Sequence, residues 1–114
     1  MDFTRLNDRL AVGPQITVAD LKEIEAAGFR SIICNRPDGE GPGQPGQAEI
    51  AAEAHARGLA FRYIPVTPGQ LGDDAATEFG LAVHEMPAPV FAYCRSGARA
   101  RALHDRARAL SSDD

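Results

Sequence analysis

The chain has 114 residues, of which 44% are hydrophobic and 25% are charged, and its formal net charge is −4. This length predicts one domain, residues 1–114, whose core needs neither a disulfide nor a metal for stability. The acidic balance argues against nucleic acid or an anionic membrane surface as a partner.

The cysteine count and the first residues of the chain indicate the cellular compartment that we expect for the protein. Two cysteines at unrelated positions, Cys34 and Cys94, indicate neither a disulfide framework nor a zinc site. The first residues lack the apolar core of a signal peptide, and no apolar run approaches membrane length. We therefore expect a cytoplasmic protein in a reducing compartment, with no metal and no other cofactor.

Short apolar runs alternate with helical patterns along the chain. The expected strands are residues 10–12, 29–34, 60–66 and 90–94, and the expected helices are residues 18–27, 45–57, 73–86 and 98–110. Thr17 and Asp20 have the spacing of a capping box, and Asp73 or Asp74 is the expected cap of the third helix. This order predicts an α/β fold of three layers, with a mostly parallel sheet and helices on both faces.

Residues 35–46 form a long segment rich in glycine and proline. The segment follows the strand 29–34 and should lie at the carboxyl edge of the sheet, where α/β domains bind ligands. Arg36 could then supply a second cation to an anion, and Asp38 or Glu40 could supply a proton. The alternative is an ordinary surface connection without a role.

The stretch of residues 90–100 carries the main chemical signal. An apolar strand ends at Cys94, a short loop of Arg95, Ser96, Gly97 and Ala98 follows, and a helix then begins. Backbone N–H groups in such a loop and in the first helical turn can converge on an anion, and they also favour a thiolate. Arg99 can hold two oxygens of a tetrahedral anion with its planar guanidinium. We predict Cys94 and Arg99 as catalytic residues and the four loop residues as an anion-binding loop, with the solvated-side-chain alternative open for Arg95.

Cys34 ends the strand that precedes the long segment. It could resolve an oxidised or persulfidated Cys94 as a disulfide. The alternative is that Cys34 is a small buried strand residue.

Five stretches together resemble one bacterial family, the phosphatase-like domain of the beta-lactamase-hydrolase-like proteins. They are Gly13-Pro14-Gln15-Ile16, Gly28-Phe29-Arg30-Ser31-Ile32-Ile33, Asn35-Arg36-Pro37-Asp38-Gly39-Glu40, Tyr63-Ile64-Pro65-Val66 and Tyr93-Cys94-Arg95-Ser96-Gly97-Ala98-Arg99. The resemblance implies a fold like that of the dual-specificity protein phosphatases. The family domain also occurs fused to persulfide dioxygenases, and its members are labelled both phosphatases and sulfur transferases.

Two departures from the cysteine phosphatases favour sulfur transfer. Those enzymes carry His-Cys-x5-Arg followed by Ser or Thr, whereas here Tyr93 precedes the cysteine, four residues separate Cys94 from Arg99, and Ala100 follows. That loop length matches the active loop of rhodaneses. In addition, no carboxylate follows Val66 where such phosphatases place their general acid.

We therefore expect a rhodanese-type sulfurtransferase that carries a persulfide on Cys94, with thiosulfate or a persulfide as donor. The alternative is a phosphatase that hydrolyses phosphate esters through Cys94, with Asp38, Glu40 or Asp73 as the acid. A third possibility is a regulatory or partner-binding domain without turnover. The expected partners are a small anionic substrate and a persulfide dioxygenase or another protein of sulfur metabolism.

Overall fold

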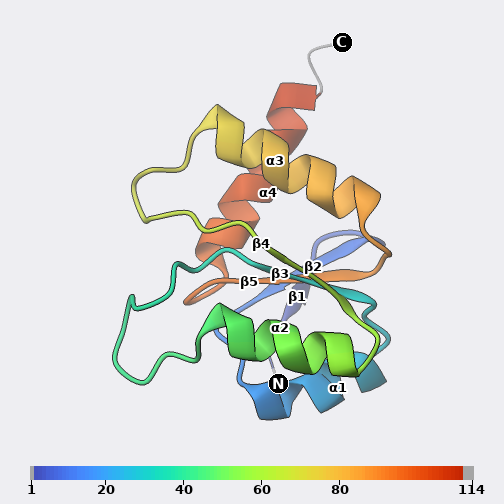
Figure 1. Ribbon diagram of the computed structural model, residues 1–114. Helices are drawn as coiled ribbons and strands as arrows, with labels where there is room; N and C mark the ends of the chain where they lie inside the picture. Colours follow the sequence, from blue (N-terminus) through green and yellow to red (C-terminus); the bar gives the residue numbers. More distant parts are fainter. Residues whose placement is uncertain (1, 112–114) are drawn as a thin grey trace.

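The computed structural model describes residues 2–111, and these build a five-stranded sheet between two layers of helices (Figure 1). The strands are β1 (Thr4–Arg5), β2 (Leu10–Gly13), β3 (Ser31–Cys34), β4 (Ala60–Tyr63) and β5 (Val90–Tyr93). Their order across the sheet is β1-β2-β5-β3-β4. All pairs are parallel except that of β1 with β2, so the predicted, mostly parallel α/β sheet is confirmed.

The helices cover both faces of the sheet. A 3-10 turn, η1 (Val18–Asp20), leads into α1 (Leu21–Ala26), and the other helices are α2 (Gln47–Ala56), α3 (Asp73–Glu85) and α4 (Ala98–Ser111). In Figure 1, α1 and α2 lie below the sheet, and α3 and α4 lie above it. The three predicted layers are therefore present.

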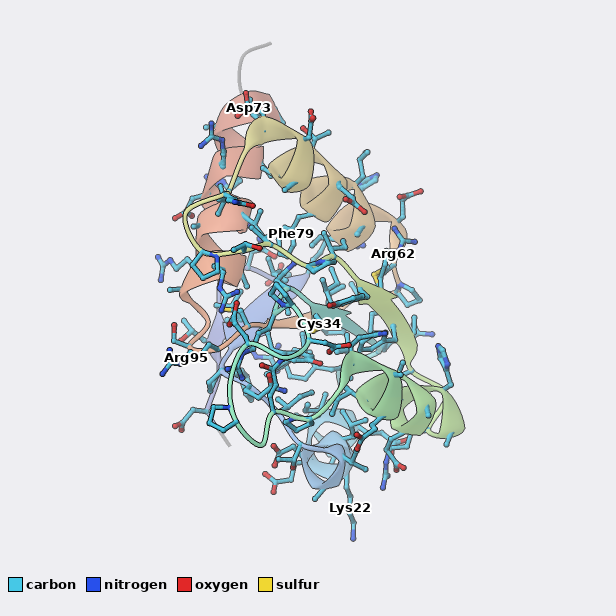
Figure 2. All side chains as sticks on the ribbon, turned by 60° about the vertical axis from the view of Figure 1, so that its left-hand side comes forward. Lys22, Cys34, Arg62, Asp73, Phe79 and Arg95 are labelled. Carbon is cyan, nitrogen blue, oxygen red and sulfur yellow. The ribbon has the colours of Figure 1, made fainter. Side chains whose placement is uncertain are left out.

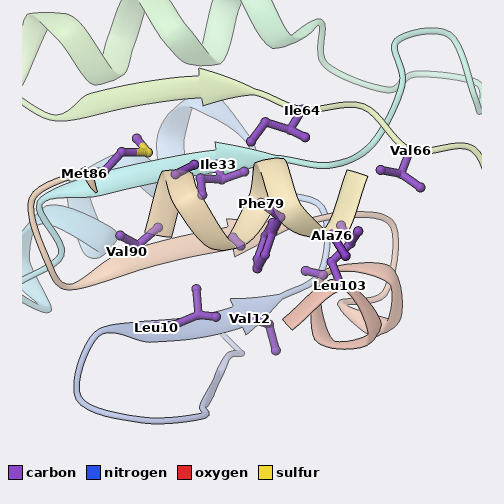
Figure 3. Close-up of a cluster of buried hydrophobic side chains, with 13 residues drawn as sticks. Leu10, Val12, Ile33, Ile64, Val66, Ala76, Phe79, Met86, Val90 and Leu103 are labelled. Atoms are coloured by element: carbon purple, nitrogen blue, oxygen red, sulfur yellow. The ribbon is translucent and has the colours of Figure 1, made fainter. Parts of the chain in front are cut away.

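Residues that alternate along each strand divide the core into two clusters, because successive side chains of a strand point to opposite faces. Val90 and Ala92 face the α3–α4 layer together with Ile33, and Phe79 of α3 packs onto them with no solvent exposure (Figure 3). Phe91 and Tyr93 face the α1–α2 layer. The central strand β5 is thus buried on both sides, which fixes the position of the residue that follows it.

Of the two predicted helix caps, one is present and the other is not. The capping box is confirmed, since Thr17 N donates to Asp20 Oδ2 at 2.8 Å and Asp20 N donates to Thr17 Oγ1 at 3.3 Å. The expectation that Asp73 or Asp74 caps α3 is wrong, because Gly72 occupies the N-cap without a side-chain hydrogen bond. Both aspartates lie in the first turn, where carboxylates interact favourably with the helix dipole.

The edge strand β1 was not predicted. It has only two residues, both exposed, so no alternation of apolar and polar residues predicts it. The third expected strand, residues 60–66, is shorter than expected: β4 ends at Tyr63, although Ile64 N–H still donates to Cys34 O and Val66 N–H to Asn35 O. Pro65 lies between these two residues and has no N–H to donate.

Three loops leave the carboxyl ends of neighbouring parallel strands. They comprise residues 35–46 after β3, residues 64–72 after β4 and residues 94–97 after β5. In Figure 1 all three emerge on the left-hand side of the sheet. The candidate site lies among them.

Candidate active site

Cys94 follows the last residue of β5 and is fully buried. Its Sγ accepts a hydrogen bond from the backbone N–H of Gly97 at 3.1 Å. The Gly97 N–H therefore points at the sulfur atom that would act as the nucleophile.

The backbone around Cys94 presents further donors at the start of α4. Among residues 2–111, the N–H groups of Arg95, Ser96, Arg99 and Ala100 have no hydrogen-bond partner. Ala98 N–H is satisfied by the hydroxyl of Ser96 at 3.3 Å. Free N–H groups in the first turn of a helix of this length form a ready binding site for an anion.

The loop owes its shape to contacts with the end of β2. Gly97 has φ of +95°, and a Cβ at this position would lie 3.3 Å from the carbonyl carbon of Gly13. Gln15 N–H donates to Arg95 O at 3.2 Å, and Cys94 N–H donates to Gly13 O at 3.4 Å. The Gly13-Pro14-Gln15 stretch therefore holds the loop in place through these hydrogen bonds and this close approach. The sequence alone did not reveal that role.

Arg99 projects from the first turn of α4 and makes a two-pronged ion pair with Glu40. Its Nη1 and Nη2 lie 2.8 and 2.7 Å from the two Glu40 oxygens, and Nη1 also donates to Val66 O at 2.9 Å. The Glu40 carboxylate raises the pKa of Arg99 above its ordinary value, and the neighbouring Cys94 contributes in the same direction. Arg99 is thus close enough to Cys94 to interact with its charge.

Arg36 joins the same cluster, as the sequence suggested that it could. Its Nε lies 3.1 Å from Glu40 Oε1, and its Nη1 donates to Gln15 Oε1 at 3.1 Å. The side chains of Arg36 and Arg99 are only 9% and 13% exposed. One carboxylate, that of Glu40, therefore joins the two guanidinium groups, and Arg99 lies beside Cys94. The sequence pointed to Glu40 only as an acid, and it gave no signal for Gln15.

The carboxylates considered as general acids have other partners. Hydrogen bonds from Arg99, and then Arg36, hold the pKa of Glu40 below its ordinary value. Asp38 Oδ1 accepts from Gln47 N–H at 2.8 Å, at the start of α2. Asp73 pairs with Arg106 at 2.6 Å, and Figure 2 shows it at the start of α3, well away from Arg95. The lowered pKa of Glu40 does not suit a general acid, and Asp38 and Asp73 are each held by another partner.

Cys34 lies in the middle of the molecule in Figure 2 and packs in the cluster that faces α1 and α2. Its Sγ donates to the carbonyl oxygen of Arg36 at 3.3 Å. Burial raises the pKa of this thiol. Both cysteines are free thiols, and the resolving role of Cys34 stays a prediction.

Neither a metal site nor a membrane span emerges from the described part of the chain. Residues 2–111 contain no group of three or more His, Cys, Asp or Glu side chains placed to hold a metal ion. Over the same range, no helix combines the length and the apolar character needed to cross a bilayer.

A mostly parallel sheet whose central strand is followed by a buried cysteine, a short loop and a helix is consistent with a phosphatase-like α/β domain. Residues 2–111 match the family model described as "Beta-lactamase hydrolase-like protein, phosphatase-like domain". The chain belongs to this family, as the sequence motifs suggested.

The comparisons with individual proteins agree with this membership. A beta-lactamase hydrolase-like protein from Agrobacterium fabrum is 39% identical over 96% of this chain and 26% of its own length. A solved structure from Neisseria meningitidis, described as a "putative phosphatase", has a TM-score of 0.91 and 34% identity over 100% of this chain and 81% of its own. The catalytic domain of the PP-IP phosphatase SIW14 from S. cerevisiae shares the fold, with a TM-score of 0.62 and 14% identity over 97% of this chain and 76% of its own.

The chain spans about a quarter of the length of the curated relatives that it matches. These comparisons favour the phosphatase alternative over the sulfurtransferase that the loop length and the missing acid suggested. The prediction of sulfur transfer is not supported by them.

Proposed function

We propose that the chain is a cysteine-dependent phosphatase that hydrolyses phosphate monoesters through Cys94. The observation that carries this proposal is the arrangement around Cys94. The Gly97 N–H donates to Cys94 Sγ, and Arg99, whose guanidinium can hold two oxygens, lies in the first turn of the helix that follows. The family and the phosphatase-like neighbours support the same class of reaction.

In the proposed first step, the Cys94 thiolate attacks phosphorus. An S–P bond forms, and the P–O bond to the leaving group breaks with its electron pair. The free N–H groups of Arg95, Ser96, Arg99 and Ala100 and the Arg99 guanidinium stabilise the charge on the three phosphoryl oxygens. In the second step, water attacks phosphorus, the S–P bond breaks, and inorganic phosphate leaves with Cys94 again a thiolate.

The engaged carboxylates restrict the substrates under this proposal. Asp38 is held at the start of α2, and Arg99 and Arg36 lower the pKa of Glu40, so neither carboxyl is suited to protonate a departing oxygen. Leaving groups that depart as stable anions, such as phenolates, are therefore the expected substrates, and alkyl phosphates are expected to react poorly.

The same observation favours a second candidate, sulfur transfer. Sulfite leaves thiosulfate without protonation, and four residues between Cys94 and Arg99 make a loop of rhodanese length. In this reaction, Cys94 attacks the outer sulfur of thiosulfate, an S–S bond forms, and sulfite departs with the electron pair of the old S–S bond. A thiol or cyanide then takes the sulfur from Cys94.

Parallel assays on one preparation test the two candidates. The proposal expects hydrolysis of nitrophenyl phosphate that disappears in Cys94→Ser, with slow conversion of thiosulfate and cyanide to thiocyanate. Cys94-dependent thiocyanate formation without hydrolysis would replace the proposal with sulfur transfer. Activity in neither assay would favour the third possibility, a regulatory or partner-binding domain.

The partners also remain proposals. A small anionic substrate suits the cluster of Arg36 and Arg99. A persulfide dioxygenase or another protein of sulfur metabolism is the macromolecular partner that we propose, and it would accompany the sulfur-transfer candidate.

A further inference from the structure

Glu40 occupies the two Nη atoms of Arg99, which form one of the edges through which a guanidinium can bind an oxyanion. Both carboxylate oxygens face the two Nη atoms of Arg99 at 2.7 and 2.8 Å, and one of them also accepts from Arg36 Nε at 3.1 Å. This is the fork-to-fork geometry in which a guanidinium grips two oxygens of a phosphate or sulfate. Glu40 and a bound oxyanion would therefore compete for the same donors.

The charges around Glu40 favour an anion at this position. The side chains of Arg36 and Arg99 are largely covered, and two neighbouring cations are more stable with an anion between them. Glu40 supplies the single negative charge that directly contacts both groups. A second anion can take the place of Glu40. The net charge of the cluster then changes only by the difference in charge between the two anions.

The loop that carries Glu40 is suited to such an exchange. The Gln44 side chain holds residues 37–44 together by hydrogen bonds within this segment. Its Oε1 accepts from the N–H groups of Glu40 and Gly41, and its Nε2 donates to Pro37 O. These bonds involve only the loop, so the carboxylate can leave Arg99 without breaking them. Glu40 itself is on the surface, with its side chain 21% exposed.

We propose that Glu40 is an internal competitor for the Arg99 guanidinium, which an oxyanion bound to the two Nη atoms displaces, and that this competition makes the site selective for dianions. A dianion replaces one negative charge by two beside two guanidinium groups and gains from the exchange. A monoanion replaces like with like and gains little. The inference rests on the anion site of the proposed function, and it adds the residue that determines which anions bind there.

The test compares the native protein with Glu40→Gln, which keeps the size of the side chain and removes its charge. The probes are sulfate, a tetrahedral dianion, and formate, a monoanionic carboxylate like the side chain of Glu40. Affinities come from calorimetry for sulfate and from the amide NMR shifts of Gly97 and Ala100 for both anions. The matched control is Glu49→Gln, an equal charge change at an exposed position of α2.

Removing a competitor held by charged hydrogen bonds should tighten sulfate binding by about tenfold or more. Formate should shift Gly97 and Ala100 in Glu40→Gln and not in the native protein, and Glu49→Gln should behave as the native protein does. Equal or weaker sulfate binding in Glu40→Gln would overturn the proposal, because it would show that Glu40 only orients Arg99.

A second variant covers the case in which Glu40→Gln does not fold. Glu40→Asp keeps the charge but shortens the side chain, so it should compete less well and bind sulfate more tightly than the native protein. An affinity equal to that of the native protein would count against the proposal.

Neither probe is turned over, so these measurements are independent of catalysis. Absence of phosphatase activity together with tighter sulfate binding in Glu40→Gln would reject the proposed function and leave the role of Glu40 standing. Phosphatase activity together with unchanged sulfate binding in Glu40→Gln would support the proposed function and reject the role of Glu40.

Discussion

Cys94 and Cys34 end neighbouring parallel strands at almost the same level of the sheet, yet their surroundings differ. Cys34 lies opposite Tyr93 in the pairing of β3 with β5, so Cys94 is only one residue further along. Cys94 Sγ accepts an N–H bond from Gly97, whereas Cys34 Sγ donates its own proton to the carbonyl oxygen of Arg36. The groups around a thiol, and not its place at the end of a strand, decide whether it is suited to act as a nucleophile.

The largest expected effect is the difference between two single substitutions. Cys94→Ser should lower the hydrolysis of nitrophenyl phosphate by about a thousandfold or more, because the nucleophile is lost. Cys34→Ser should change kcat by no more than a few fold, since this thiol packs in the core and its hydrogen bonds are with Arg36 O and Tyr93 and not with the loop after β5. Steady-state rates on folded variants, checked by circular dichroism, decide between them. Comparable losses in both variants would remove the distinction.

Arg99→Lys tests the guanidinium that distinguishes the surroundings of Cys94. A point charge cannot hold two oxygens in one plane, so kcat/KM should fall by about a hundredfold. Thermal stability should change little. Arg95→Lys, on the neighbouring exposed loop residue, is the matched control and should keep most of the activity. Full activity in Arg99→Lys would place the anion elsewhere.

Gly97→Ala tests the loop conformation that places an N–H group beside Cys94. The φ of +95° and the 3.3 Å approach to Gly13 leave no relaxed position for a Cβ, so we expect a loss of about 1–2 kcal/mol in unfolding free energy. Gly69→Ala is the control, because Gly69 has φ of +82° but a Cβ added there would meet no atom within 4 Å. Denaturant unfolding measures both variants. An equal loss would show that the contact with Gly13 adds nothing to the cost of the positive φ.

The smallest effect concerns the pH dependence of stability through Cys34. Burial raises the pKa of this thiol above its ordinary value of 9.0. The contribution of the neutral thiol is fully present below that pH and is lost as the pH rises toward the folded-state pKa, because the unfolded chain ionises first. Unfolding free energy should therefore decline more steeply above pH 9 in the native protein than in Cys34→Ser. Parallel curves would contradict this environment for Cys34.

Most of the fold could be predicted because its signals are local. The apolar runs at β2, β3 and β5 and the Thr17–Asp20 capping box each identify an element without knowledge of its neighbours. The end of β4 and the cap of α3 were less accurate, since Pro65 interrupts the pairing and Gly72 takes the place of an aspartate. The strand β1 depends on a partner strand and left no pattern of its own.

The site could be predicted only in part, for a related reason. Cys94, its loop and Arg99 are contiguous, so their spacing identifies them. The contacts of Arg99 with Glu40 and of Arg36 with Gln15 join residues that are 59 and 21 positions apart. Such contacts depend on the order of the strands, which places the segments after β2, β3 and β5 at one edge, and no short motif encodes that order.

The most direct test of the central claim is the identity of the group carried by Cys94 during turnover. The protein is mixed with nitrophenyl phosphate, quenched in acid within one turnover, and analysed by intact mass and peptide mapping, with thiosulfate in a parallel sample. The account predicts one phosphoryl group on Cys94 and none on Cys34. A single added sulfur on Cys94 from thiosulfate, with no phosphoryl group from the ester, would contradict it.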